Sequence, residues 1–207
     1  MPAEPWMQTY TGLKFSLVPN DYYGNLLSPL DIAHGLSNIC RWGGHVKEFY
    51  SVAQHSVLVS YACPTKPLAG LLHDASEAFL GDIISPLKSM LPGYKELEHQ
   101  LQDVIAFRFG LGSGDLRCKE VVDADMLLLA MERRDLLTTP NFTWSACPDI
   151  PPPTPSNRIN PVSPHLARKY FMDRFYELTG VKGRWKEADE HDKIQEALEK
   201  AKELAAQ

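Results

Sequence analysis

The chain has 207 residues, of which 44% are hydrophobic and 23% charged, as expected for a soluble globular protein that buries its own core. Its formal net charge of −5 argues against a nucleic-acid partner, because polyanion binding needs a basic face. Scattered cysteines without a CxxC pair, an N-terminus unlike a signal peptide and the absence of a membrane-length apolar run predict a cytoplasmic protein without a membrane partner.

The first part of the chain predicts a small hairpin followed by helices. Residues 6–18 alternate in polarity around Thr11-Gly12, which is typical of two short strands and a turn. Ser28 and Pro29 then provide an N-cap and a first helical residue for a helix that should reach about Arg41. Further helical segments are expected over residues 51–63 and 67–81, with a short helical turn from 85.

The second part predicts longer helices separated by a proline-rich connection. Amphipathic or apolar spacing indicates helices over residues 94–109, 120–137 and 164–179. Between the last two, residues 138–164 hold eight of the sixteen prolines and read as a long connection. We therefore predict an all-α fold with a minor N-terminal β-hairpin. One domain should span residues 1–182, followed by a charged and helical tail over 183–207.

The segment LAGLLHDASEAFLGD contains the most informative cluster of ionisable residues. On a helix, His73, Asp74 and Glu77 would share one face within an apolar frame. Three buried ionisable groups are costly unless a metal ion or hydrogen bonds satisfy them. The His73-Asp74 pair alone favours neither a metal site nor a structural hydrogen bond, since the same pair occurs as His191-Asp192 in the charged tail.

Two other predicted helices add candidate ligands. His55 lies within one apolar helix, and Asp125 precedes the apolar run of a later one. The order of a histidine, a His-Asp pair and a distant aspartate resembles the HD-domain metal-dependent phosphohydrolases. The surrounding "RW…H…HDASE…GD…AD" resembles most closely the 5′-deoxynucleotidases and phage deoxyadenosine triphosphate triphosphohydrolases. The likeness covers about residues 29–137 and implies an HD-domain helical bundle.

The resemblance also implies roles for individual residues. One divalent ion (Mn, Co, Zn, Ni or Mg) would be held by His55, His73, Asp74 and Asp125, with His34 as a rival ligand whose spacing fits less well. The catalytic acids would be Glu77 and Asp82. Glu77 would orient a water, or alternatively fix the tautomer of a histidine, and Asp82 equally suits a cap of the turn at Ser85. The substrate-binding residues would be Arg41, Trp42, His45 and Lys88.

One departure affects the expected substrate. The family often has a lysine three positions before the late aspartate, where this chain has Val122, so Lys119 or no residue takes that phosphate contact. We expect hydrolysis of a deoxynucleoside monophosphate or triphosphate by a homo-oligomer. The alternatives are an HD phosphohydrolase acting on another small phosphate, a non-catalytic nucleotide-binding HD module, and a structural helical protein with His-Asp hydrogen bonds.

Overall fold

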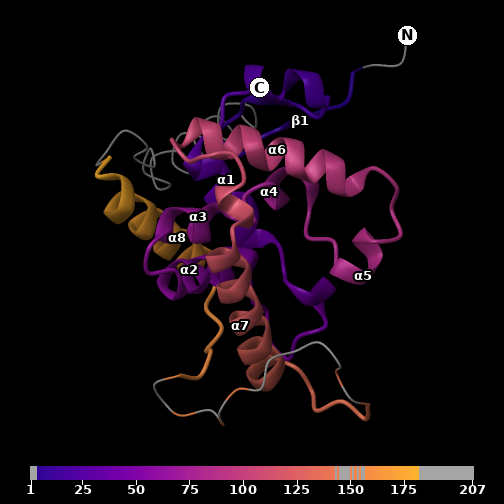
Figure 1. The fold of residues 1–207 in the computed structure, drawn as a ribbon, viewed down its shortest axis with the longest axis vertical. Helices are drawn as coiled ribbons and strands as arrows, with labels where there is room; N and C mark the ends of the chain where they lie inside the picture. The colour runs from indigo at the N-terminus through magenta and orange to yellow at the C-terminus, as the bar shows by residue number, and fades with distance from the viewer. Residues whose placement is uncertain are drawn as a thin grey trace, which may run out of the picture.

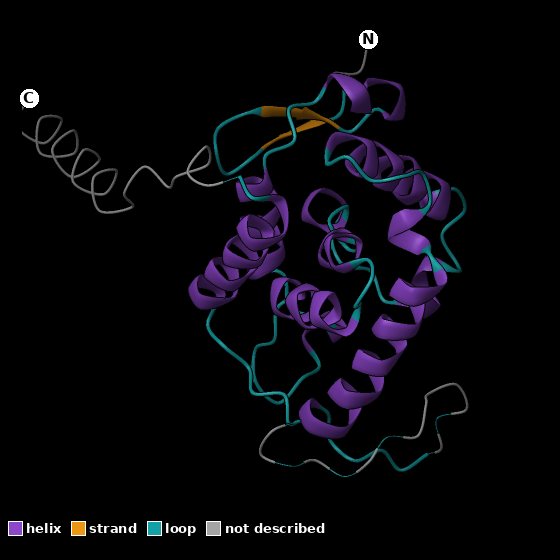
Figure 2. Cartoon of the chain, turned by 60° about the vertical axis from the view of Figure 1, so that its left-hand side comes forward, coloured by secondary structure: helices purple, strands orange, loops and turns teal. Residues whose placement is uncertain are grey.

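The computed structural model describes residues 4–142, 144, 150, 152, 154 and 157–181. The described chain is mostly helical, with one small two-stranded antiparallel sheet at its N-terminal end (Figures 1 and 2). The α-helices are α1 (Pro29–Asn38), α2 (Val52–Ala62), α3 (Pro67–Leu72), α4 (Glu77–Leu80), α5 (Ser85–Lys88), α6 (Tyr94–Arg108), α7 (Lys119–Leu136) and α8 (Pro164–Thr179). The expected tail over 183–207 lies outside the described residues.

The N-terminal hairpin forms as predicted and covers one end of the helical body. Strand β1 (Trp6–Gln8) pairs with β2 (Lys14–Ser16), with Met7 opposite Phe15. Phe15 is buried, and its ring stacks on that of Phe79 with centroids 4.0 Å apart. The hairpin is therefore held to the body through an aromatic contact with α4. A 3-10 helix, η1 (Pro19–Gly24), follows it and was not predicted.

Helix α2 lies at the centre of the molecule. It packs against α1, α3, α7 and α8, and its residues from Val52 to Val57 are all buried. Ser51 caps it, accepting a hydrogen bond from the backbone N–H of Gln54 at 3.1 Å. A helix enclosed on most sides needs apolar residues nearly all round. The buried His55 in its middle must therefore be satisfied by partners from neighbouring helices.

Helix α1 ends earlier than predicted, at Asn38 instead of about Arg41. The chain leaves the helix because Cys40 forms an isolated antiparallel bridge with Ser51. A short 3-10 turn, η2 (Trp42–Gly44), follows, in which Trp42 has a φ of +60°. Positive φ is strained for a bulky side chain, so the surrounding contacts must hold this conformation.

The predicted single helix over 67–81 is wrong, since α3 and α4 are separated by a turn at residues 73–76. Within that turn the backbone hydrogen bonds tighten to three-residue spacing, as from Glu77 N–H to the Asp74 carbonyl. Helix α3 sits so close to α2 that a Cβ on Gly70 would lie 2.9 Å from the Cys63 sulfur. The glycine thus permits the approach that brings the start of the turn towards α2.

The remaining helices close the body around these elements. Helices α6 and α7 match the expected segments to within two residues, and α8 has the expected bounds, ending at Gly180 with a φ of +68°. Helix α8 packs on α1, α2 and α3, and its Phe175 meets Phe109, the residue that follows α6, edge to face with ring centroids 5.5 Å apart. Among the described residues, no helix is both long and apolar enough to cross a membrane.

Candidate metal centre

Two buried histidines from different elements face each other at the centre of the molecule. His55 comes from α2 and His73 from the turn after α3, and neither is more than 6% exposed. Their Nε2 atoms are 3.3 Å apart. With Asp74 they form a group whose ligand atoms all lie within 4.8 Å of one another and that could hold a metal ion.

In each imidazole, the hydrogen bond made by Nδ1 determines whether Nε2 carries a proton. Nδ1 of His73 donates to the backbone carbonyl of Gly70 at 2.9 Å, so a neutral ring carries its proton there. Nδ1 of His55 lies 2.6 Å from Oε1 of Glu132, which likewise favours a proton on that nitrogen. With both protons on Nδ1, the lone pairs of the two Nε2 atoms would face each other across 3.3 Å. Such an arrangement is favourable only with a proton or a cation between them.

Two aspartates lie next to the histidine nitrogens. Oδ2 of Asp74 lies 3.2 Å from Nε2 of His73 and 3.6 Å from that of His55. Oδ1 of Asp125, on α7, lies 3.1 Å from Nε2 of His55 and 4.0 Å from that of His73. Metal–ligand bonds of about 2.0–2.2 Å place neighbouring donors about 3 Å apart. His55, His73 and Asp74 therefore lie at spacings that fit one divalent ion. Asp125 reaches His55 from α7 but stands outside this group of three.

Glu132 is a functional candidate that sequence reasoning missed. It is fully buried and accepts hydrogen bonds from Arg41 Nε at 3.1 Å and Trp42 Nε1 at 2.9 Å, besides its contact with His55. A carboxylate this deep is tolerated only because charged and polar donors surround it. The sequence did hold one indication of its role, the spacing to Asp125. Glu132 follows that residue by seven positions, which is two helical turns and places both on the same face of α7.

The carboxylates shape the ionisation of this cluster. Burial and Arg41 lower the pKa of His55, but Glu132 and Asp125 more than offset them and raise this pKa to about 9. Burial raises the pKa of Asp74, yet the neighbouring histidines and Arg41 bring it far below its usual range. The cluster therefore attracts positive charge strongly, either as a proton or as a metal ion.

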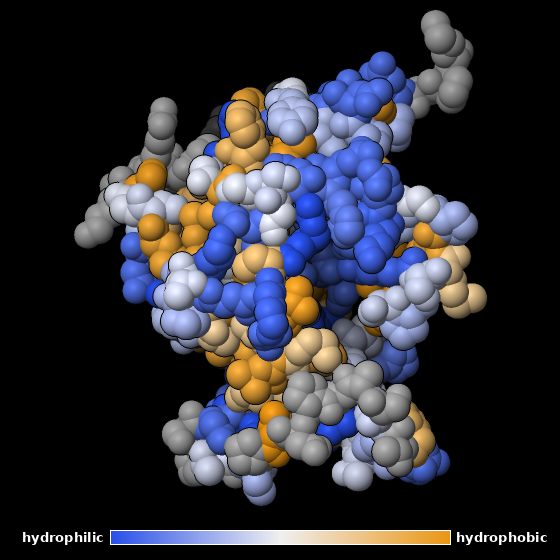
Figure 3. Space-filling view, in the orientation of Figure 1, coloured by the Kyte–Doolittle hydropathy of each residue, from blue (hydrophilic) through white to orange (hydrophobic). Residues whose placement is uncertain are grey.

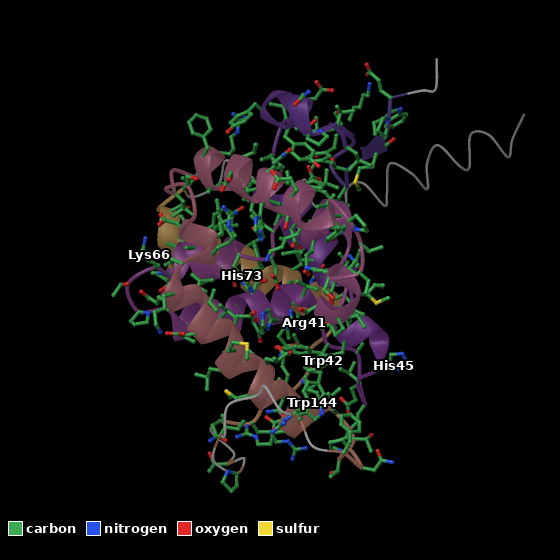
Figure 4. All side chains as sticks on the ribbon, turned by 45° about the vertical axis from the view of Figure 1, so that its right-hand side comes forward. Arg41, Trp42, His45, Lys66, His73 and Trp144 are labelled. Atoms are coloured by element: carbon green, nitrogen blue, oxygen red, sulfur yellow. The ribbon has the colours of Figure 1, made fainter. Side chains whose placement is uncertain are left out.

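Arg41 and Trp42 lie against this cluster, as Figure 4 shows. Nη1 of Arg41 donates to Oδ2 of Asp74 at 3.2 Å, while its Nε donates to Glu132. Two of the three guanidinium nitrogens thus support the carboxylates around the histidines. The indole of Trp42 is fixed at one end by Glu132 and meets Trp144 edge to face at the other, with centroids 5.8 Å apart.

Glu77 and Lys88 form the other polar part of the site. Nζ of Lys88 donates to Oε1 of Glu77 at 3.1 Å and to Oε1 of Glu98 at 2.6 Å. Oε2 of Glu77 is buried and has no hydrogen-bond partner in the described structure. Burial, with Asp74 and Asp82 nearby, raises the pKa of Glu77 well above its usual value. In Figure 3 a hollow with hydrophilic walls lies between α5, α6 and α7, which carry Lys88, Glu98 and Asp125.

The other predicted residues are placed as follows. Asp82 is half-buried, and helix α5 has no side-chain cap, so the alternative role as a cap is wrong. His45 lies at a separate cavity next to Trp42. His34 stacks on Tyr10 and contacts Arg168, so it is no ligand of this cluster. Lys119 forms an exposed ion pair with Asp123 at 2.5 Å.

Comparison with known proteins gives relatives but no activity. The chain is 42% identical to the uncharacterized protein YfdR of Escherichia coli (strain K12) over 153 residues, covering 73% of this chain and 84% of that protein. It is also 45% identical over 92 residues to an uncharacterized protein of Rhodobacter capsulatus, covering 39% of this chain. That second match spans 47%, about half, of the relative's length. No protein-family model matches the chain.

Proposed function

The chain belongs to the family of the Escherichia coli protein YfdR, and we propose that it is an HD-domain, metal-dependent phosphohydrolase acting on deoxynucleotides. The observation that carries the proposal is the pair of buried Nε2 atoms, from His55 and His73, that face each other at 3.3 Å. A carboxylate oxygen of Asp74 lies 3.2 Å from Nε2 of His73, and one of Asp125 lies 3.1 Å from Nε2 of His55. The order of these residues along the chain is that of the HD-domain enzymes.

The donor set suits a divalent cation in both charge and chemistry. Two neutral imidazoles and two carboxylates bind Zn, Mn, Co or Ni readily, while Arg41 and Glu132 hold the ligands in place. A divalent ion held here would lower the pKa of a water and withdraw charge from a phosphoryl oxygen. The role of the remaining residues is to position the water and the substrate around it.

Glu77 is the proposed general base. Lys88 holds its Oε1, so Oε2 is left to accept the proton of the attacking water. A raised pKa suits this role, because a stronger base takes the proton more readily once the carboxyl is ionised. Asp82 stays a candidate for substrate positioning.

A matched pair of variants on one helix tests the proposal. Asp125→Ala should lose the stoichiometric metal and reduce phosphate release from nucleotides by at least about a hundredfold, since a metal ligand is removed. Asp123→Ala, an exposed aspartate two residues earlier, should change neither. Metal content is measured by elemental analysis, and activity with deoxynucleoside mono- and triphosphates in the presence of Mn, Co, Zn, Ni or Mg.

The outcomes of this test separate the alternatives. If the protein hydrolyses other phosphate esters but no nucleotide, the proposed hydrolysis stands and the proposed substrate class is wrong. Metal and nucleotide binding without any turnover would identify a binding module. Full metal content in Asp125→Ala would remove that residue from the ligand set, and absence of bound metal in the parent protein would leave a structural histidine cluster.

A further inference from the structure

A cavity of about 500 Å³ lies beyond Trp42, on the side away from the histidines. It is lined by Thr138, Thr139 and Pro140 of the connection after α7, and by His45, Arg133 and Trp144 among others. Its volume is in the range of small-molecule sites. Of the residues that line it, His45 has been given an expected role in substrate binding, and the cavity itself has been given none.

The lining of this cavity is aromatic and cationic. The ring of Phe142 lies nearly parallel to that of Trp144, with centroids 6.3 Å apart and an interplanar angle of 20°. The Arg133 guanidinium carbon lies 5.7 Å from the Trp144 ring centroid. Phe142 is 64% exposed, so its face is open to a ligand. Aromatic faces with an arginine favour a flat, conjugated ring as occupant.

Residues that line the cavity adjoin residues of the metal cluster. Glu132 and Arg133 are consecutive on α7, yet Glu132 contacts His55 whereas Arg133 lines the cavity. Trp42 bridges the two regions, bonded to Glu132 and in edge contact with Trp144. Figure 4 shows His73, Arg41, Trp42 and Trp144 following one another in that order down the molecule.

The separation of the two regions matches the length of a nucleotide. Asp125 and Arg133 are eight residues apart on one helix, which corresponds to about 12 Å along its axis. An extended mononucleotide spans a comparable distance from its phosphate to the far edge of its base. Asn141 at the cavity offers both a donor and an acceptor to a base edge.

We propose that this cavity, formed by Arg133, Phe142 and Trp144 next to Trp42, is the subsite that takes the base of the substrate nucleotide by stacking. The inference rests on the proposed function for its substrate. It adds that affinity for the base comes from the connection after α7 and not from the helices that carry the metal ligands. Stacking is tolerant of base identity, so the site should accept purines and pyrimidines.

The test is a binding measurement that needs no turnover. Calorimetry in the presence of EDTA compares the four deoxynucleoside 5′-monophosphates with 2-deoxyribose 5-phosphate, which lacks the base. Trp144→Ala should weaken binding of the nucleotides about tenfold and leave that of the sugar phosphate unchanged. Trp144→Phe should retain most of the affinity, and Phe142→Ala should show the same selective loss in smaller measure.

The matched control is Tyr61→Ala. Tyr61 also lies under an arginine, with Arg174 at 4.1 Å from its ring centroid, but on the exposed side of α2. The Tyr61→Ala variant should bind all probes with the affinity of the parent protein. Thermal unfolding verifies that each variant is folded. Equal losses for nucleotide and sugar phosphate in Trp144→Ala, or no loss for either, would overturn the subsite. Phosphate release by the parent protein tests the proposed hydrolysis separately, so either idea can fail alone.

Discussion

His55 and His34 are two histidines of neighbouring core helices in opposite electrostatic surroundings. His55 has carboxylates on both nitrogens, from Glu132 at 2.6 Å and Asp125 at 3.1 Å. His34 stacks on Tyr10 with centroids 3.8 Å apart, and Arg168 Nη1 lies 3.2 Å from its Nδ1. A guanidinium beside an imidazole repels a further cation, whereas carboxylates attract one. The charge of the neighbours therefore distinguishes a candidate metal-ligand histidine from a structural one.

The largest expected effect follows from removing one histidine of each kind. His73→Ala should abolish stoichiometric metal binding, because it removes one of two imidazole ligands that face each other at 3.3 Å. His34→Ala should keep one metal ion per chain and lose stability only, by about 1–2 kcal/mol. Elemental analysis and thermal unfolding of both variants measure this contrast. Loss of metal in His34→Ala would erase the distinction.

A smaller effect is expected from the carboxylate behind His55. Glu132→Gln keeps the shape of the side chain but weakens its bond to Nδ1 of His55. Metal affinity should fall about 10- to 100-fold, as is usual when the partner of a ligand histidine is altered. The control is Glu120→Gln on the same helix, whose carboxylate bonds the backbone N–H of Thr65 instead. Titration with a competing chelator gives both affinities, and equal affinities would remove Glu132 from the site.

The smallest expected effect is the pH dependence of metal binding, which tests the environment of His55. The pKa of metal-free His55 is raised to about 9, so this ring is protonated near pH 7 and must release its proton to bind a metal. Affinity should therefore rise about tenfold per pH unit from 7 to 9, with about one proton released. Calorimetry in buffers of different ionisation enthalpy counts that proton. An affinity independent of pH would contradict the assigned environment of His55.

The same raised pKa has a consequence for the metal-free protein. A histidine whose folded pKa lies above its unfolded value of about 6.5 stabilises the fold fully below pH 6.5. That contribution is lost as the pH rises through about 9. Thermal unfolding in EDTA should thus occur at a lower temperature at pH 9 than at pH 6.5, and added metal should reduce the difference.

Local signals predicted most of the fold. The Ser28 and Ser163 caps and the glycine after residue 179 mark helix ends that the structure reproduces closely. The missed features depend on contacts between distant segments. The bridge from Cys40 to Ser51 stops α1, and the break at residues 73–76 accompanies the close packing of α3 on α2 at Gly70. Neither contact has a signature in the sequence near it.

In the candidate site, too, some residues could be predicted from the sequence and others depend on contacts between distant segments. The ligand order of His55, the His-Asp pair and Asp125 could be read from the chain, because a known family has the same order. Glu132 and Glu98 were missed, since a glutamate in an amphipathic helix looks like any solvated residue until its partners are placed. The edge-to-face contact of Trp42 with Trp144 joins residues about a hundred positions apart, and only the fold brings them together.

The most direct test is a crystal structure of the protein grown with Mn²⁺, with anomalous diffraction measured to locate the ion. We expect one peak per chain, about 2.0–2.3 Å from Nε2 of both His55 and His73, with Asp74 and Asp125 as further ligands. A fully occupied peak elsewhere, or none at this position, would contradict it.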